Sequence, residues 1–203
     1  MKLIWVRHGE TLWNRQYRLQ GLSDVALSEL GCRQAEQLAA AFLEKPAHIF
    51  VSPLQRAQTF AAPLATRFEL PLQLDDNLRE MSFGQWEGLS YAEMDQAMQK
   101  QFAAWCNDPV TNTPPAGEGA AALAARVDDF LQTLVARLEQ EETAVIVTHG
   151  GVIRTAVTLA MQMPAAAAGR LQIDTASLTT LYNYNNCWYL AKLNDTSHLQ
   201  ERV

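Results

Sequence analysis

Three short runs of consecutive apolar residues predict buried strands. They are LIWV at 3–6, HIFV at 48–51 and AVIVT at 144–148. A run that is apolar at every position, instead of every second one, is typical of a strand covered on both faces. Residues with a helical period follow each run, so strands and helices alternate along the chain.

Helical periodicity predicts four helices, over residues 28–42, 54–68, 121–138 and 151–161. Ser28 is a residue type that caps helix N-termini. Pro53 favours the start of the second helix, whereas Pro63 would kink or shorten it. The third helix is amphipathic. The fourth is largely apolar, so we expect it to be packed on both sides.

The C-terminal stretch has a different pattern. The segments SLTTLYNY and CWYLAKL flank Asn185 and Asn186 and predict a hairpin, which would form an antiparallel edge. Together with the alternating strands and helices, this predicts an α/β fold, a three-layer αβα sandwich with a mostly parallel sheet. The stretch at 108–119 is a loop by composition. No repeat or linker divides the chain, so we predict a single domain over residues 1–203.

Composition narrows the function classes. The chain has 203 residues and a net charge of 16 − 22 = −6, so we expect no nucleic-acid partner, and any anion site must be a local cluster of cations. No apolar run is long enough for a membrane span, and the N-terminus lacks a signal-peptide pattern. The three cysteines are isolated and suggest neither a zinc site nor a disulfide framework. We expect a reduced, cytoplasmic protein, and the oligomeric state stays open.

Polar residues stand where the predicted strands end. The sequence RHG at 7–9 follows the first strand, Arg56 lies one turn into the helix after the second, and THGG at 148–151 follows the third. Ligands bind outside the carboxyl ends of strands in an open α/β sheet. If these strands are neighbours, one pocket holds two imidazoles, two guanidiniums and helix N-termini. Such a pocket predicts a phosphate site.

This set of residues suits phosphoryl transfer. A neutral imidazole can attack phosphorus and form a phosphohistidine, provided that its other nitrogen is held as a donor. Arginines neutralise the phosphoryl oxygens during transfer. An acid must protonate the leaving oxygen, and the segment LREMSFGQWEG at 78–88 offers Glu80 and Glu87.

Four motifs together carry a family resemblance. RHGET, SPLQRAQTF, REMSFGQWEG and VTHGGVIR appear in this order and resemble the landmarks of the histidine phosphatase superfamily, which has the phosphoglycerate mutase-like fold. The resemblance covers nearly the whole chain. It implies that His8 is the nucleophile, that Glu80 is the general acid and later the base, and that Arg7, Arg56 and His149 bind the phosphate.

The resemblance also implies the surroundings of these residues. Further substrate or phosphate contacts fall on Asn14, Gln20, Gly21 and Gly150, with Thr11 at the mouth of the pocket. The family uses no metal, so we expect neither a metal nor a cofactor. A lid or insert is expected at about residues 76–118. Arg79 is expected to be solvated, and Arg154 either reaches the pocket or pairs with a surface carboxylate.

The class of reaction follows from the segment after Glu80. The mutases of this family are longer and carry a basic residue and a histidine there, whereas this chain has EMSFGQWEG and resembles the phosphatase branch. A phosphoglycerate mutase and a non-catalytic phosphate-binding protein are the less favoured alternatives. We therefore predict a phosphomonoesterase.

The substrate is suggested by residues 102–119. This aromatic and Pro/Gly-rich segment resembles the lid of α-ribazole phosphatases, which dephosphorylate α-ribazole 5′-phosphate in cobalamin assembly. Aromatic faces can stack on a flat base, and Phe83, Trp86, Phe102 and Trp105 are available. These side chains can equally form a small core of the lid itself. In that case the alternative is a phosphatase of broad specificity for sugar and other organic phosphates.

Overall fold

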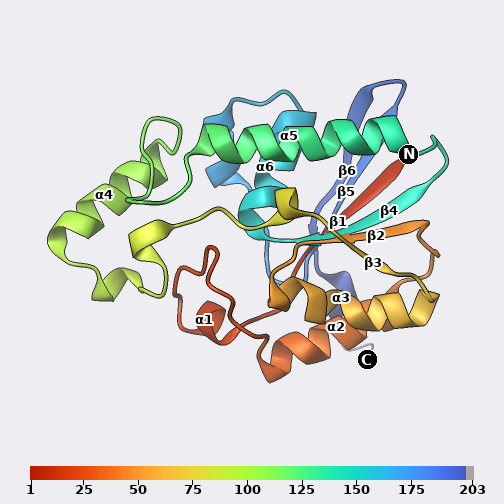
Figure 1. Cartoon of the computed structure of the whole chain (residues 1–203), viewed down its shortest axis with the longest axis horizontal. Helices are drawn as coiled ribbons and strands as arrows, with labels where there is room; N and C mark the ends of the chain where they lie inside the picture. Colours follow the sequence, from red (N-terminus) through yellow and green to blue (C-terminus); the bar gives the residue numbers. More distant parts are fainter. Residues whose placement is uncertain (200–203) are drawn as a thin grey trace.

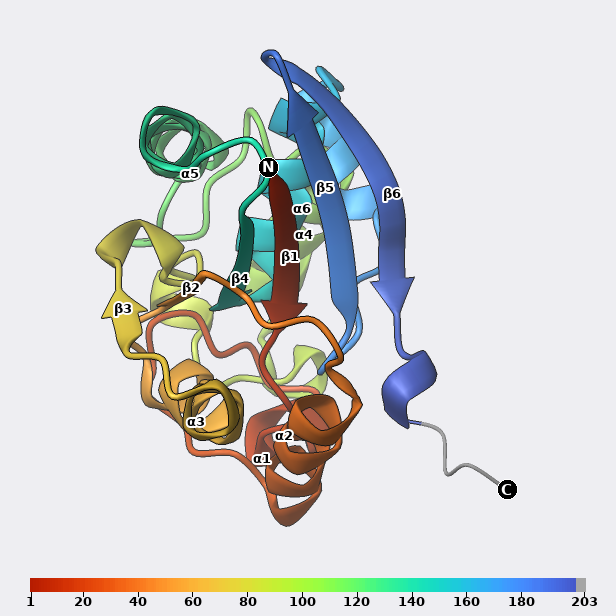
Figure 2. The same ribbon diagram turned by 90° about the vertical axis from the view of Figure 1, so that its right-hand side faces the viewer.

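The computed structural model describes residues 1–199, in which one sheet is covered by helices on both faces (Figures 1 and 2). Within this range the sheet has six strands in the order β3-β2-β4-β1-β5-β6. The first four strands in that order pair parallel with one another. Strand β5 pairs antiparallel with β1, and β6 pairs antiparallel with β5. The strands are β1 Lys2–Arg7, β2 His48–Val51, β3 Leu72–Leu74, β4 Thr143–Thr148, β5 Leu178–Tyr184 and β6 Cys187–Asp195.

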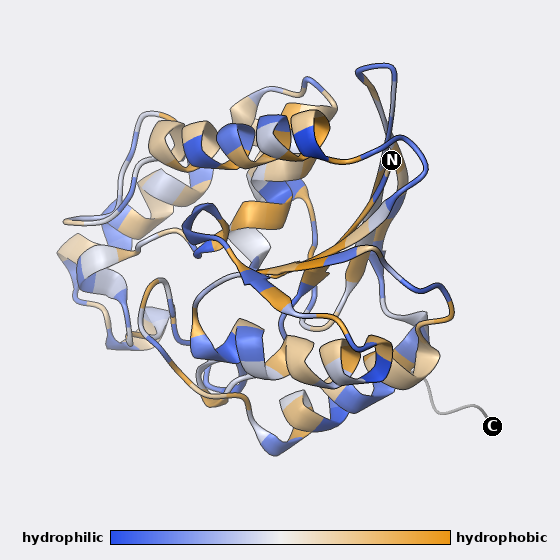
Figure 3. Cartoon of the chain, turned by 45° about the vertical axis from the view of Figure 1, so that its right-hand side comes forward, coloured by the Kyte–Doolittle hydropathy of each residue, from blue (hydrophilic) through white to orange (hydrophobic). Residues whose placement is uncertain are grey.

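Helices on the two faces of the sheet enclose separate apolar cores. The α-helices are α1 Leu12–Arg15, α2 Glu29–Ala41, α3 Gln55–Phe68, α4 Gln96–Asn107, α5 Ala120–Arg137 and α6 Gly150–Ala160. Helices α2 and α3 pack with one set of buried side chains, and α5 and α6 with the other. The central strands are the most apolar part of the chain (Figure 3), because both of their faces are buried. The predicted αβα sandwich with an antiparallel edge is confirmed.

Most of the predicted elements are present. The three apolar runs are the central strands β1, β2 and β4. Ser28 caps α2 by accepting a hydrogen bond from the N–H of Gly31 at 3.1 Å. The hairpin of β5 and β6 turns at Asn185 and Asn186, whose φ angles of 49° and 63° are those of a tight hairpin turn.

Three local features differ from the expectation. Helix α3 runs without a break through Pro63, because its buried face anchors both halves to the sheet. The short edge strand β3 was not predicted, since three residues carry little periodicity. Helix α4 was also missed. It is capped by Asp95, and its apolar side chains, Phe102 and Trp105 among them, pack on the aromatic residues of the preceding loop, so none of its residues is fully buried.

The connection between β3 and α5, residues 75–119, extends beyond the sheet and contains α4 (Figure 1). It includes the short 3₁₀ helices η1 Asp76–Leu78, η2 Gly84–Trp86 and η3 Tyr91–Glu93, while η4 Ala165–Arg170 and η5 Ser197–Leu199 lie nearer the C-terminus. None of the helices in residues 1–199 has the length and apolar character needed to cross a bilayer. The same residues contain no group of three His, Cys, Asp or Glu side chains arranged to hold a metal ion. The last four residues of the predicted 1–203 unit lie outside this range.

Candidate active site

The carboxyl ends of β2, β4 and β1 lie side by side, so the motifs that follow these strands meet. The N–H of His8 donates to the carbonyl of Thr148 at 2.9 Å, which joins the two strand ends. The rings of His8 and His149 lie edge to face with their centroids 5.1 Å apart. The structure therefore brings the two predicted histidines into one buried site.

The hydrogen bonding of His8 defines its tautomer. Its Nδ1 lies 2.7 Å from the carbonyl oxygen of Gly9. A carbonyl only accepts, so Nδ1 carries the proton and Nε2 keeps its lone pair. Burial, followed by the positive charges of Arg56 and Arg7, lowers the pKa of His8 well below its usual value. The imidazole is therefore neutral near pH 7 and has the form of a nucleophile.

His149 follows β4 and is the N-cap of α6. Its Nε2 lies 2.8 Å from the hydroxyl oxygen of Ser52, and its buried Nδ1 has no hydrogen-bond partner within residues 1–199. Burial, then the charge of Arg56, lowers the pKa of His149 as well. Ser52, the first residue of the SPLQRAQTF motif, directly follows β2. The structure places it where it orients His149.

Arg7 and Arg56 bring buried positive charge to the site. Arg7 donates from Nη1 to the carbonyl of Ile173 at 2.7 Å. Arg56, which is fully buried, donates to the carbonyls of Ser23 at 2.8 Å and Gly21 at 2.7 Å. In the described part of the chain neither forms an ion pair, and the Nε atoms of both lack a partner. Two guanidiniums with unused donors and no carboxylate partner form a site for an anion.

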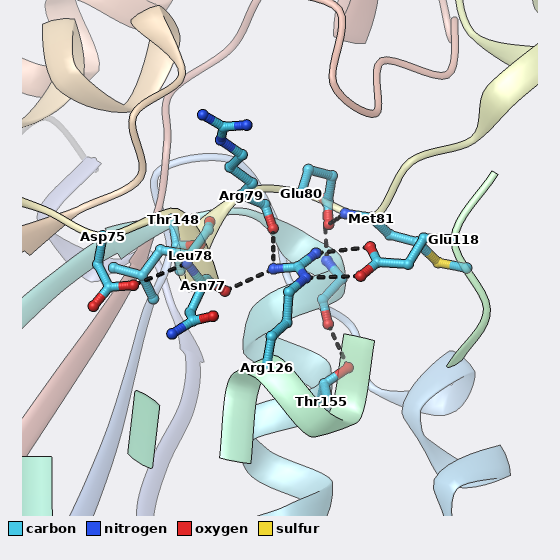
Figure 4. A network of polar contacts seen from close by, with 11 residues as sticks. Asp75, Asn77, Leu78, Arg79, Glu80, Met81, Glu118, Arg126, Thr148 and Thr155 are labelled. Carbon is cyan, nitrogen blue, oxygen red and sulfur yellow. Dashed lines mark hydrogen bonds and ion pairs between the residues drawn. The ribbon is translucent and has the colours of Figure 1, made fainter. Parts of the chain in front are cut away.

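Glu80 lies at the rim of this site and faces the first turn of α6 (Figure 4). Its Oε2 accepts from the N–H of Gly151 at 3.2 Å, and its Oε1 accepts from the N–H of Met81 at 2.9 Å. Glycine at position 151 lets the carboxylate approach the start of α6, because a Cβ there would force the Glu80 side chain to shift. Burial lowers the pKa of both Arg7 and Arg56, and the charge of Glu80 is the largest opposing influence on each.

Glu87, the alternative acid in the sequence, has a different role. Its carboxylate accepts from the N–H and hydroxyl of Ser23 and from the N–H groups of Leu22 and Phe83, at 2.6–3.1 Å. It therefore ties the loop after Gly21 to the connection between β3 and α5. Gly21 has a φ of +52° and its backbone abuts this carboxylate. With its oxygens occupied by four donors, Glu87 is less suited than Glu80 to exchange protons.

The remaining predicted contacts lie around the arginines. Gly21 offers its carbonyl to Arg56, and Gln20 is buried beside it with an Oε1 that has no partner among residues 1–199. Gly150 begins α6, and a Cβ there would lie 3.6 Å from Nε of Arg7. The Oδ1 of Asn14 accepts from the backbone and hydroxyl of Thr11 at 3.0 Å, which caps α1. Asn14 thus has a structural task in addition to its predicted contact.

Arg154 and Arg79 differ in their surroundings. Arg79 pairs with Asp76 at 2.9 Å on the surface, as expected. Arg154 forms no ion pair in residues 1–199 and donates from Nε to the carbonyl of Leu171 at 2.8 Å. Its Nη1 lies 3.2 Å from the position of a Cβ on Gly150. Arg154 therefore adds a third cation near the start of α6. Because α6 is apolar on most sides, its sequence pattern did not predict which way the Arg154 side chain points.

A cavity of about 360 Å³ opens beside Glu80 and Gly151. Its walls come from the connection between β3 and α5 and from α5, α6 and η4. They are mainly apolar, and Arg154 and Glu80 provide its charged groups. Its other lining residues include Phe83, Trp105, Leu123, Thr158, Met163 and Ala168. Glu80, Gly151 and Arg154 line this cavity, whereas the arginine and histidine side chains of the site do not, so the cavity lies beside the arginine site.

The aromatic residues of the connection form a cluster. Trp86 is fully buried and contacts Phe102 and Trp105 edge to face, with ring centroids 5.5 Å and 6.0 Å away. Phe83 packs on Trp105 in the same way at 5.6 Å. Trp86 and Phe102 do not line the cavity, whereas Phe83 and Trp105 do. Two rings of the cluster thus lie in a small core of the connection, and two lie at the cavity wall.

Comparison with known proteins places this site in a family. The model of the histidine phosphatase superfamily (branch 1) matches residues 3–196. Phosphoserine phosphatase 1 of Hydrogenobacter thermophilus is 31% identical over 202 residues, covering 99% of this chain and 95% of that protein. The adenosylcobalamin/alpha-ribazole phosphatase of Escherichia coli is 29% identical and covers 96% and 91%. The structure of a mycobacterial glucosyl-3-phosphoglycerate phosphatase superposes with a TM-score of 0.89 at 32% identity, covering 96% and 99%.

The chain belongs to the histidine phosphatase superfamily. The predicted family and its fold are confirmed, and with them the coarse class of a hydrolase that acts on phosphate esters. Three relatives at 29–32% identity carry three different substrate names, so the ester is not decided by similarity.

Proposed function

We propose that this protein is a phosphomonoesterase that works through a phosphohistidine on His8. The single observation that carries the proposal is the state of that imidazole. Its Nδ1 is held by the carbonyl of Gly9, and its ring is buried beside the unpaired guanidiniums of Arg7 and Arg56. A lone pair on Nε2 next to a bound phosphate is the arrangement that in-line attack requires.

In the first step Nε2 of His8 attacks phosphorus, and the bond from phosphorus to the leaving oxygen breaks. Arg7 and Arg56 stabilise the charge on the three phosphoryl oxygens. The side chain of His149 and the N–H of Gly150 add donors to them. Glu80 gives its proton to the leaving oxygen, which departs as an alcohol.

In the second step water replaces the alcohol. Glu80, now a carboxylate, takes a proton from the water as its oxygen attacks phosphorus. The phosphorus–nitrogen bond breaks, and inorganic phosphate and free His8 are formed. Glu80 ends the cycle protonated, so the two half-reactions balance.

The cavity beside Glu80 supports α-ribazole 5′-phosphate as the ester that is hydrolysed, which would give the enzyme a place in cobalamin nucleotide-loop assembly. A benzimidazole nucleoside is flat and apolar, and Phe83 and Trp105 offer ring faces and edges to it. A polyhydroxylated group would lose hydrogen bonds with water against such walls without replacement. Arg154 is placed to donate to a polar atom of the nucleoside.

A second candidate is a phosphatase of broad specificity. It is favoured by the relatives, whose names include phosphoserine phosphatase and glucosyl-3-phosphoglycerate phosphatase at similar identity. Both candidates share the chemistry at His8 and differ only in what the cavity selects. Arg154 suits the second candidate as well, because it can pair with a substrate carboxylate.

The test is kcat/KM for α-ribazole 5′-phosphate, 3-phosphoglycerate and a simple sugar phosphate. A preference for the first of about 100-fold, roughly 2.7 kcal/mol of transition-state binding, supports the nucleoside substrate. Similar values for all three support the broad-specificity enzyme. A His8→Ala variant that still turns over any of these esters at the wild-type rate contradicts the phosphohistidine itself.

A further inference from the structure

Arg126 of α5 binds both ends of the connection between β3 and α5 (Figure 4). Its Nε and Nη2 donate to the two carboxylate oxygens of Glu118, each at 2.8 Å. Its Nη1 donates to the carbonyls of Asn77 and Arg79, both at 2.6 Å. Asn77 and Arg79 lie near the start of the connection and Glu118 near its end, so one guanidinium fastens the segment at both ends.

The bond to Arg79 acts directly on the neighbouring residue. The carbonyl of Arg79 and the N–H of Glu80 belong to the same planar peptide group. Holding that carbonyl fixes the plane from which the Glu80 side chain departs. The Glu80 carboxylate is hydrogen-bonded to the N–H groups of Gly151 and Met81 and not to Arg126, so Arg126 acts on it only through this peptide group.

The three residues before Glu80 are each held by a side chain of the main body. Arg126 binds the carbonyls of Asn77 and Arg79, and the hydroxyl of Thr148 donates to the carbonyl of Leu78 at 2.7 Å. Thr148 is the last residue of β4, beside His149. These contacts link the position of Glu80 to the end of β4, beside the phosphate site. They join residues that are far apart in the sequence, so the spacing of residues does not predict them.

The surroundings of Arg126 separate it from the phosphate-binding arginines. Its guanidinium pairs with Glu118, and both side chains are only 18% exposed. A bidentate pair of this kind is stronger than an exposed one and has a fixed geometry. Arg7 and Arg56 keep unused donors, whereas most donors of Arg126 are engaged by protein groups.

We propose that Arg126 is the positioning residue for the general acid of this enzyme, and that it holds Glu80 in line with the leaving oxygen. This inference rests on the proposed acid role of Glu80. Arg126 donates only to Glu118 and to the carbonyls of Asn77 and Arg79, and to no side chain of the phosphate site, among residues 1–199. Its loss therefore weakens protonation of the leaving oxygen and leaves attack by His8 intact.

The test compares two esters in wild type, Glu80→Gln and Arg126→Gln. One ester is an alkyl phosphate, whose leaving group needs a proton, and the other is 2,4-dinitrophenyl phosphate, whose leaving group needs little help. We expect Arg126→Gln to lower kcat/KM for the alkyl ester by about 10- to 100-fold, a partial loss compared with the roughly 10²- to 10⁴-fold that general acid catalysis contributes as a whole. The aryl ester should change by less than about threefold. In the double variant, Arg126→Gln should add little to the loss caused by Glu80→Gln alone.

The matched control is Arg137→Gln on the same helix. Arg137 also donates to a partner outside α5, to Gln73 at 2.7 Å, but it is exposed and lies at the other end of the helix from Arg126. It should leave both esters unchanged. Glu118→Gln, which weakens the anchor of Arg126 without removing it, should give a smaller loss with the same preference for the alkyl ester. It also keeps the test usable if Arg126→Gln does not fold.

Equal losses on both esters in Arg126→Gln and Glu118→Gln would overturn the positioning role and leave a purely structural one. Unchanged kinetics in both variants would overturn it too. If Glu80→Gln itself fails to distinguish the two esters, the acid assignment under the proposed function fails, whatever Arg126 does. The two failures are therefore separate results.

Discussion

The imidazoles of His8 and His149 meet edge to face, 5.1 Å apart between ring centroids, in the buried site between β1 and β4. Two buried cations in one site would repel each other and the nearby guanidiniums. The low pKa of each ring avoids that repulsion and keeps the site ready for a phosphate dianion. In the proposed mechanism the neutral ring of His8 provides the nucleophile, and the positive charge that attracts the phosphate comes from Arg7 and Arg56.

The proton donor can be tested with two carboxamide variants. Glu80→Gln should lower kcat/KM for alkyl phosphates by about 100-fold or more and affect activated aryl phosphates far less, as expected for general acid catalysis. Glu87→Gln is the matched control, because its parent carboxylate accepts four hydrogen bonds and is a structural group. It should lower thermal stability and change both esters alike. The reverse pattern would make Glu87 the acid.

The buried histidines predict a pH dependence of stability. Their folded pKa values lie below the unfolded value, so the unfolded chain binds more protons as the pH falls. Stability is complete above about pH 6.5, the usual histidine pKa, and declines below it by up to about 1.4 kcal/mol per pH unit for each ring. Urea unfolding between pH 7 and 5 measures this slope. His8→Asn should reduce it, and an identical slope in that variant would contradict the prediction.

A large side chain placed in the cavity beside Glu80 should change which esters the enzyme hydrolyses. Ala168 of η4 lines it, so Ala168→Trp should lower kcat/KM for an ester with a bulky aromatic group by about 10-fold or more, the scale of one lost pocket contact. A small ester should be unaffected. Ala166→Trp, on an exposed residue of η4 that does not line the cavity, is the control. Equal effects on the small and the bulky ester would mean that the substrate does not use this space.

Chelation should leave the activity unchanged. In the proposed mechanism the guanidiniums of Arg7 and Arg56 neutralise the phosphoryl oxygens, and the lone pair of His8 provides the nucleophile without a metal-bound hydroxide. The measurement is phosphate release before and after dialysis against EDTA. A strong loss that a divalent ion restores would contradict the mechanism.

The sequence predicted the centre of the site better than its surroundings. His8 and His149 follow apolar runs that are unmistakable strands, and parallel strands bring such ends to one edge. Arg56 was found because it lies one turn after a strand end. The positions of these residues follow from the strands that directly precede them, and those strands can be predicted from the local sequence.

Other features depend on tertiary contacts that no local pattern encodes. Arg126 binds backbone carbonyls about 47 to 49 residues away in sequence. Strand β3 is three residues long, too short for a period, and α4 packs only on the loop that precedes it, with no fully buried residue. Arg154 lies on a helix that is apolar on most sides, and its direction is set by packing.

The stereochemical course at phosphorus tests the central claim most directly. A phosphorothioate ester that is chiral at phosphorus is hydrolysed in isotopically labelled water, and the configuration of the product is determined. Two successive in-line displacements, first by His8 and then by water, each invert the centre, so the account predicts net retention. Net inversion would mean that water attacks the ester directly, and it would contradict a phosphohistidine on His8.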